Sequence, residues 1–128
     1  MKILFDTHIL LWAAAEPEKL PVSVLTVLES NDTEPLFSAA SIWEIAIKAA
    51  LGRTDFQIEI HAFRRGLLDN GYEELAITGK HAATLSGLPN LHKDPFDRIL
   101  IAQAITEGIA FISADAQLKQ YPGVQYHS

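Results

Sequence analysis

The sequence contains no cysteine. A disulfide framework and a thiolate metal site are therefore excluded, and the fold depends on the packing of apolar side chains alone. A reducing compartment is compatible with this composition, and we expect a cytoplasmic protein.

Long apolar runs are also missing, because no segment approaches the length that a bilayer-spanning helix requires. The N-terminal run resembles a signal sequence in that Lys2 precedes apolar residues, but Asp6 and His8 interrupt it. We therefore expect a soluble protein with no membrane association.

Basic residues are few: 10 Lys and Arg stand against 16 Asp and Glu, which gives a formal net charge of −6. This balance argues against a polyanionic partner held by charge, unless several of the acidic side chains share a cation-filled pocket. The 128 residues suffice for one core, and we treat residues 1–128 as a single domain.

Hydrophobic patterning predicts short strands that alternate with helices. We expect strands at residues 2–5, 35–37, 72–77, 110–113 and 124–126. We expect helices at residues 7–15, 22–30, 39–51, 59–69, 78–86 and 95–107. This alternation predicts the α/β class, with a central parallel sheet that is covered by helices on both faces.

Acidic residues occur where predicted strands end and helices begin. Asp6 directly follows the first strand, and Asp115 follows the strand AFIS. Each has a simple structural interpretation as an N-cap, in which the carboxylate accepts hydrogen bonds from backbone N–H groups of the next turn. Taken singly, neither residue is strong evidence for a functional site.

Glu44 lies within a predicted helix that is apolar on nearly every other side. It could be the acid of an S-x-x-E capping box that starts at Ser41, or the partner of Lys48 in an i, i+4 ion pair. Ser38 is the better cap candidate, which would place Glu44 in the middle of the helix. A carboxylate on a largely buried helix needs a partner, because desolvating an unpaired carboxylate is expensive.

Asp94 and Asp97 open the predicted helix over residues 95–107. Asp94 is a candidate N-cap, because the next residue is Pro95 and proline is well suited to the first helical position. Asp97 falls in the first turn, where the helix dipole favours negative charge. Capping does not explain why so apolar a helix carries both acids into a site with little water.

Together these positions predict a metal site. Ligands bind beyond the carboxyl ends of the strands in open parallel sheets, and convergent carboxylates repel one another unless a cation lies among them. Oxygen ligands select Mg²⁺ or Mn²⁺, and such an ion lowers the pKa of a water that it binds, which suggests phosphodiester hydrolysis. Thr7 and Ser113 could add hydroxyl contacts or could bond only to the backbone.

Four segments carry a family resemblance: ILFDTHILLW, SAASIWEIAIKAALGR, LHKDPFDRILIAQA and AFISADAQL. In this order they resemble PIN-domain proteins, specifically bacterial toxin ribonucleases of the VapC type, over essentially the whole chain. The resemblance implies a three-layer α/β/α sandwich and an endoribonuclease that depends on Mg²⁺ or Mn²⁺. It also implies a cognate antitoxin whose segment lies across the toxin and blocks its site.

Carried onto this sequence, the resemblance assigns metal binding and catalysis to Asp6, Glu44, Asp97 and Asp115. Asp97 takes the third position of the family motif because it directly precedes RILIAQA. Asp94 belongs to the DPFD variant of that motif and is expected to be an auxiliary acid or a cap.

Basic residues beside these acids are candidates for contact with RNA phosphates: Lys48, Lys93 and Arg98. The alternative for each is a solvated basic side chain. The five histidines are scattered, and we assign none of them to catalysis. We expect a homodimer, and exposed apolar residues at Trp43, Ile47 and Phe63 could receive the antitoxin, although core packing is the alternative for each.

Other classes of protein fit the sequence less well. A phosphoryl-accepting receiver domain also binds Mg²⁺ in an acidic pocket, but it needs paired acids after the first strand and a lysine after the last. Here the first strand is followed by Asp6 alone, and the last strand, VQYHS, offers no lysine. A haloacid-dehalogenase-type phosphatase needs an acid where His8 stands. A catalytically silent module with the same fold stays open as an alternative.

Overall fold

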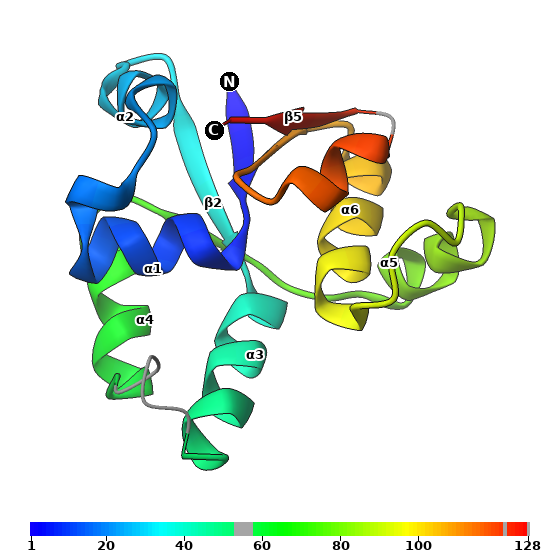
Figure 1. Ribbon diagram of the computed structural model, residues 1–128, viewed down its shortest axis with the longest axis horizontal. Coiled ribbons are helices and arrows are strands. Elements are labelled where there is room, and N and C mark those ends of the chain that lie inside the picture. The colour runs from blue at the N-terminus through cyan, green and yellow to red at the C-terminus, as the bar shows by residue number, and fades with distance from the viewer. Residues whose placement is uncertain (53–57, 122, 128) are drawn as a thin grey trace.

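A five-stranded parallel sheet forms the centre of the chain, as seen in a computed structural model that describes residues 1–52, 58–121 and 123–127 (Figure 1). The strands lie in the order β3-β2-β1-β4-β5, and every neighbouring pair is parallel. Their bounds are β1 Lys2–Phe5, β2 Glu34–Ser38, β3 Glu73–Leu75, β4 Ala110–Ser113 and β5 Val124–Tyr126.

Helical segments connect the strands. The α-helices are α1 Thr7–Ala15, α2 Val22–Glu29, α3 Ala39–Ala50, α4 Ile60–Asp69, α5 Gly79–Thr84 and α6 Pro95–Glu107. Short 3₁₀ segments occur at η1 Pro17–Lys19, η3 Leu85–Gly87 and η4 Ala116–Gln120. In the described part of the chain, no helix is both long and apolar enough to cross a membrane.

Alternating side chains of the strands pack against helices on both faces of the sheet. In β1, Ile3 and Phe5 face one apolar cluster, to which α1, α2 and α4 contribute, whereas Leu4 faces a second cluster built largely from α6. This alternation follows from the two-residue period of a strand. The result is the predicted three-layer α/β/α sandwich, with helices on either side of the sheet in Figure 1.

The predicted elements are confirmed, with small differences in their bounds. The expected strand over 72–77 is shorter, because its partner β2 ends at Ser38, which caps α3, so pairing stops at Leu75. The expected helix over 78–86 divides into α5 and η3. Helix α6 has the predicted bounds, with Asp94 as N-cap, Pro95 in its first turn and Gly108 in the left-handed conformation at its end.

The order of the strands creates a switch point between β1 and β4. From β1 the chain proceeds to β2 and β3 on one side of the sheet, and β4 and β5 lie on the other. The connections that leave the carboxyl ends of β1 and β4 therefore run in opposite directions, which leaves a crevice between them. Asp6 and Asp115 follow these two strands.

Candidate metal centre and active site

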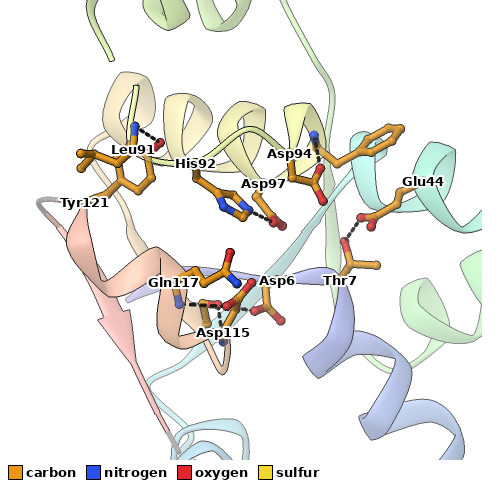
Figure 2. A network of polar contacts seen from close by, with 12 residues as sticks. Asp6, Thr7, Glu44, Leu91, His92, Asp94, Asp97, Asp115, Gln117 and Tyr121 are labelled. Atoms are coloured by element: carbon orange, nitrogen blue, oxygen red, sulfur yellow. Dashed lines mark hydrogen bonds and ion pairs between the residues drawn. The ribbon is translucent and has the colours of Figure 1, made fainter. Parts of the chain in front are cut away.

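An acidic cavity of about 120 Å³ lies at this switch point. Its lining comes from the start of α1, the middle of α3, the start of α6 with the preceding loop, and the turn after β4. The lining residues are Asp6, Thr7, His8, Glu44, Lys48, His92, Asp94, Asp97 and Asp115. Figure 2 shows the carboxylates of α6 facing those of Asp6 and Asp115, with Glu44 to one side.

Asp6 is the N-cap of α1 and is also part of the cavity wall. Its Oδ1 accepts a hydrogen bond from Ile9 N at 2.9 Å, and its Oδ2 accepts from the Ser113 hydroxyl and from Ala114 N at 3.2 Å. The residue as a whole is only 4% exposed. Burial raises the pKa of the Asp6 carboxyl, although the hydrogen bonds from Ser113 and Ile9 oppose that rise.

Glu44 lies in the middle of α3 and points into the cavity, with only 4% of the residue exposed. Its Oε1 accepts from the Thr7 hydroxyl at 2.8 Å, and its Oε2 is 2.7 Å from Lys48 Nζ. Ser38 is the N-cap of α3, so the capping-box interpretation of Glu44 is wrong and the i, i+4 ion pair is confirmed. This buried carboxylate has the partners that its desolvation requires.

Asp94 and Asp97 stand one turn apart at the start of α6. The Asp94 carboxylate accepts from Phe96 N at 2.9 Å, whereas Asp97 Oδ2 lies 2.9 Å from His92 Nε2. Burial raises the pKa of Asp97 to about 7, and the negative charges of Asp94 and Glu44 add to that rise, while the hydrogen bond from His92 opposes it. The cavity therefore penalises ionisation of Asp97, as it does that of Asp6.

Asp115 caps the short helix η4, where its Oδ1 accepts from Gln117 N at 2.9 Å. Ser113 connects it to Asp6: the Ser113 hydroxyl accepts from Asp115 N at 3.0 Å and donates to Asp6 Oδ2. The capping predictions for Asp6, Asp94 and Asp115 are thus confirmed. Capping occupies one oxygen of Asp94 and one of Asp115, so it leaves the second oxygen of each for a ligand.

The donor set fits a divalent cation that prefers oxygen ligands. Five carboxylates and one threonine hydroxyl line a single small cavity, and Lys48 is the lysine that accompanies them. Donor atoms of His92, Asp94 and Asp97 lie within 4.8 Å of one another, so the Asp94 and Asp97 carboxylates are close enough to share one ion. Carboxylate and hydroxyl oxygens suit Mg²⁺ or Mn²⁺, and a cation there would offset both the burial of the Asp97 carboxyl and its repulsion by Asp94 and Glu44, which together raise its pKa.

The structure brings most of the predicted site residues together. The acids expected as ligands, Asp6, Glu44, Asp97 and Asp115, line the cavity with Asp94, Thr7 and Lys48. Ser113 is fully buried behind Asp6 and touches it through its hydroxyl.

Two predicted contacts to RNA lie outside the cavity lining. Lys93 is exposed, and the Arg98 guanidinium bonds to Asn90 Oδ1 at 3.2 Å and to the Leu88 carbonyl. Arg98 thereby holds the loop that precedes α6. A role for either residue in binding RNA stays a prediction.

Two histidines of the site were not predicted. His92 bonds to Asp97, and His8 is an exposed lining residue whose charge lowers the pKa of Asp6. His92 lies five residues before Asp97 and outside α6, so no helical periodicity relates the two. Only the fold of the loop before α6 brings this imidazole to the carboxylate.

Comparison with known proteins identifies related sequences. The family model described as the PIN domain matches residues 3–124. The ribonuclease VapC22 of Mycobacterium tuberculosis (strain ATCC 25618 / H37Rv) is 30% identical over 120 residues, which cover 93% of this chain and 91% of that protein.

Solved structures share the fold at lower identity. The VapBC2 complex of Rickettsia felis bound to a DNA fragment from its promoter includes a chain that is 16% identical, with a TM-score of 0.74 and coverage of 99% of this chain and 98% of that one. A chain of VapBC-1 from nontypeable Haemophilus influenzae is 17% identical, with a TM-score of 0.66 and coverage of 100% and 98%. On the family match and the curated relative, the chain belongs to the PIN domain family and resembles its VapC-type members.

Proposed function

We propose that this protein is an endoribonuclease that depends on Mg²⁺ or Mn²⁺ and hydrolyses RNA phosphodiesters. The observation that supports the proposal is the convergence of five carboxylates in one cavity at the switch point of the sheet. The relative that is 30% identical is named a ribonuclease, which indicates the same class of substrate. A binding module without catalysis has no need to bury so many mutually repelling acids.

The residues that would hold the cation are Asp6, Asp97 and Asp115, with Glu44 and Asp94 at the sides of the cavity. When bound, a divalent cation supplies Lewis-acid activation of water and stabilises the charge that develops on the phosphate oxygens. This chemistry needs no side-chain nucleophile.

Other side chains orient these acids. The Ser113 hydroxyl and Ile9 N fix the Asp6 carboxylate from two directions, and Thr7 fixes Oε1 of Glu44. His92 holds Oδ2 of Asp97, which leaves Oδ1 without a donor among the described residues. Such contacts around metal ligands fix their orientation before a substrate arrives.

Lys48 is the lysine of the cavity wall, and we propose that it contacts the substrate. Its ammonium group is 2.7 Å from Glu44 Oε2, and its side chain is partly exposed. It offsets part of the negative charge of the cavity, so that a phosphate can approach. With a net charge of −6 on the whole chain, RNA affinity should be modest and should fall as salt is added.

RNA cleavage by the purified protein tests the proposal. We expect cleavage of single-stranded RNA in Mg²⁺ or Mn²⁺, none in EDTA, and a loss of at least about 100-fold in Asp6→Asn and Asp97→Asn. Asp69→Asn, at an exposed position on α4, is the matched control for removal of one acid and should cleave normally. Cleavage that persists in both site variants, or that is unaffected by EDTA, would refute the assigned chemistry.

A cognate antitoxin is the proposed protein partner, since the solved neighbours described above are VapBC complexes. An apolar groove of about 660 Å³ between α1 and α4 could receive a segment of it. Small side chains line the groove at Ala13, Ala14 and Ala62, beside Phe63 and Gly66. Trp43 and Ile47, also predicted to receive the antitoxin, are exposed on α3, whereas Phe63 is buried in the core at the base of the groove.

Co-purification with the protein encoded by the adjacent gene tests the partner. Gly66 offers a clean variant, because an added Cβ would meet nothing within 4 Å. Gly66→Glu should fold and cleave RNA but lose the partner, whereas Gly66→Ala should keep it. If Gly66→Glu retains the partner at wild-type affinity, the groove is not the docking site.

A further inference from the structure

Trp43 on α3 and Phe96 on α6 form an aromatic pair, in which Trp43 is exposed and Phe96 is half-buried. Trp43 is 57% exposed although it is one of only two tryptophans in the chain. Its ring packs edge to face with that of Phe96, with centroids 5.0 Å apart and an interplanar angle of 80°. Singly exposed apolar side chains are common, so the position of Trp43 decides whether its exposure points to a ligand.

The geometry of the pair does not use both faces of the indole. In an edge-to-face contact, the edge of one ring meets the face of the other. Phe96 therefore covers at most one face of the Trp43 indole, and Trp43 is 57% exposed. Phe96 braces the indole and leaves exposed apolar surface that can accept a second planar group.

The chain places this surface beside the acidic cavity. Trp43 directly precedes Glu44 on α3, and Phe96 lies between Asp94 and Asp97 in the first turn of α6. All three acids line the cavity, whereas the two aromatic residues do not. The aromatic pair thus lies one residue along the chain from a cavity-lining acid on each of the two helices that it joins, and we call it the rim pair.

Two kinds of ligand could cover the rim pair. Ile47 on α3 and Leu51, the C-cap of α3, follow Trp43 at i+4 and i+8 and are also exposed, so an apolar stripe could contact a protein. However, the stripe does not explain the braced indole, which is the feature that adjoins the catalytic acids. Nucleobases of single-stranded RNA are flat and stack on aromatic side chains, and Lys48, which is partly exposed in the cavity wall and paired with Glu44, could meet a phosphate.

We propose that Trp43, braced by Phe96, is a stacking platform for one unpaired nucleobase next to the scissile phosphate. This inference rests on the proposed ribonuclease function and specifies its substrate class. The platform holds the backbone of that nucleotide over the acidic cavity. It requires an unstacked base, and it therefore selects single-stranded RNA over duplex RNA whatever the base sequence.

Fluorescence of Trp43 tests the platform without cleavage. The conservative variant Trp12→Phe leaves Trp43 as the only tryptophan. In Ca²⁺, which has the same preference for oxygen ligands as Mg²⁺, a single-stranded RNA of random sequence should quench this fluorescence, and a fully paired duplex of equal length should not. Equal quenching by both RNAs, or none by either, overturns the inference.

Cleavage by a variant series gives the second test. Trp43→Ala should weaken binding of single-stranded RNA about 10-fold, seen as a higher KM with kcat changed by less than about twofold, and Trp43→Phe should restore most of it. Ile47→Ala, one turn further along the same face, is the matched control and should behave as wild type. Mg²⁺ should raise the free energy of unfolding of all three variants as much as that of the wild type, because the proposed metal ligands remain.

The outcomes separate this inference from the proposed function. Cleavage by the wild type without quenching of Trp43, or with equal KM for Trp43→Ala, would overturn the platform and leave the ribonuclease assignment intact. Quenching without cleavage in any divalent metal would count against the ribonuclease assignment alone. A different result is possible for the stripe: a changed oligomeric mass in solution and an equally raised KM in each of Trp43→Ala, Ile47→Ala and Leu51→Ala. That result would make the stripe a protein interface and would overturn the platform.

Discussion

Replacing Asp97 by Asn should stabilise the metal-free protein while it abolishes activity. The Asp97 side chain is only 17% exposed, and burial together with the charges of Asp94 and Glu44 raises its pKa from 3.8 to about 7. Because the native carboxyl binds its proton more tightly than the unfolded one, the free energy of unfolding falls as the pH rises from about 4 to about 7. Above about pH 7 the free energy of unfolding has lost the whole of this contribution.

The magnitude follows from the size of the pKa change. At 1.36 kcal/mol for each pKa unit, a rise from 3.8 to about 7 corresponds to at most about 4 kcal/mol at pH 8 and to less than half of that at pH 5. Asparagine has the same shape but no charge, and its Oδ1 can still accept from His92. We expect metal-free Asp97→Asn to exceed the wild type by about 2–4 kcal/mol at pH 8, with a smaller difference at pH 5.

Urea denaturation in EDTA at the two pH values measures this difference, with exposed Asp69→Asn as the control for loss of one charge. Addition of Mg²⁺ or Mn²⁺ at pH 8 should then stabilise the wild type and not Asp97→Asn, because a ligand that binds only the native state shifts unfolding by mass action. The reasoning would be refuted if Asp97→Asn were less stable than the wild type in EDTA at pH 8, or gained as much from metal.

Two further predictions concern side chains that hold the site and the core. Thr7→Val removes the hydroxyl that bonds to Glu44 and should lower both Mn²⁺ affinity and kcat about 10-fold with KM unchanged, whereas Thr7→Ser should restore both. Titration calorimetry measures the affinity and RNA cleavage measures kcat, and equal effects of the two substitutions would contradict this positioning role. Gln103→Leu removes the buried acceptor of the Ser38 hydroxyl and should lower the free energy of unfolding, measured by urea denaturation, by about 1–3 kcal/mol. An unchanged midpoint of urea denaturation would show that this hydrogen bond contributes nothing to stability.

Local signals in the sequence suffice for most of the fold. Helix α6 is the clearest case, because Asp94, Pro95 and Gly108 mark its two ends independently of its tertiary contacts. The bounds of β3 were less predictable, because a strand at the edge of a sheet is only as long as its partner allows. Pairing between β2 and β3 ends at Ser38, where the chain turns into α3.

The candidate site was predictable wherever an acid follows a strand or opens a helix, as with Asp6 and Asp115. The contact between His92 and Asp97 was not, because it depends on how the loop before α6 folds back. The role of Thr7 was also only partly predictable. A hydroxyl beside the site was expected, but its bond to Glu44 joins α1 to α3 across 37 positions of the chain, and sequence patterns carry no information on such pairs.

The central claim is that the carboxylates of the cavity gather around a divalent cation. Anomalous diffraction from crystals grown with Mn²⁺ tests it most directly. We expect an anomalous peak within about 2.0–2.6 Å of carboxylate oxygens of Asp6 and Asp97. Crystals at millimolar Mn²⁺ with no peak in the cavity, from protein that still cleaves RNA only when metal is added, would contradict it.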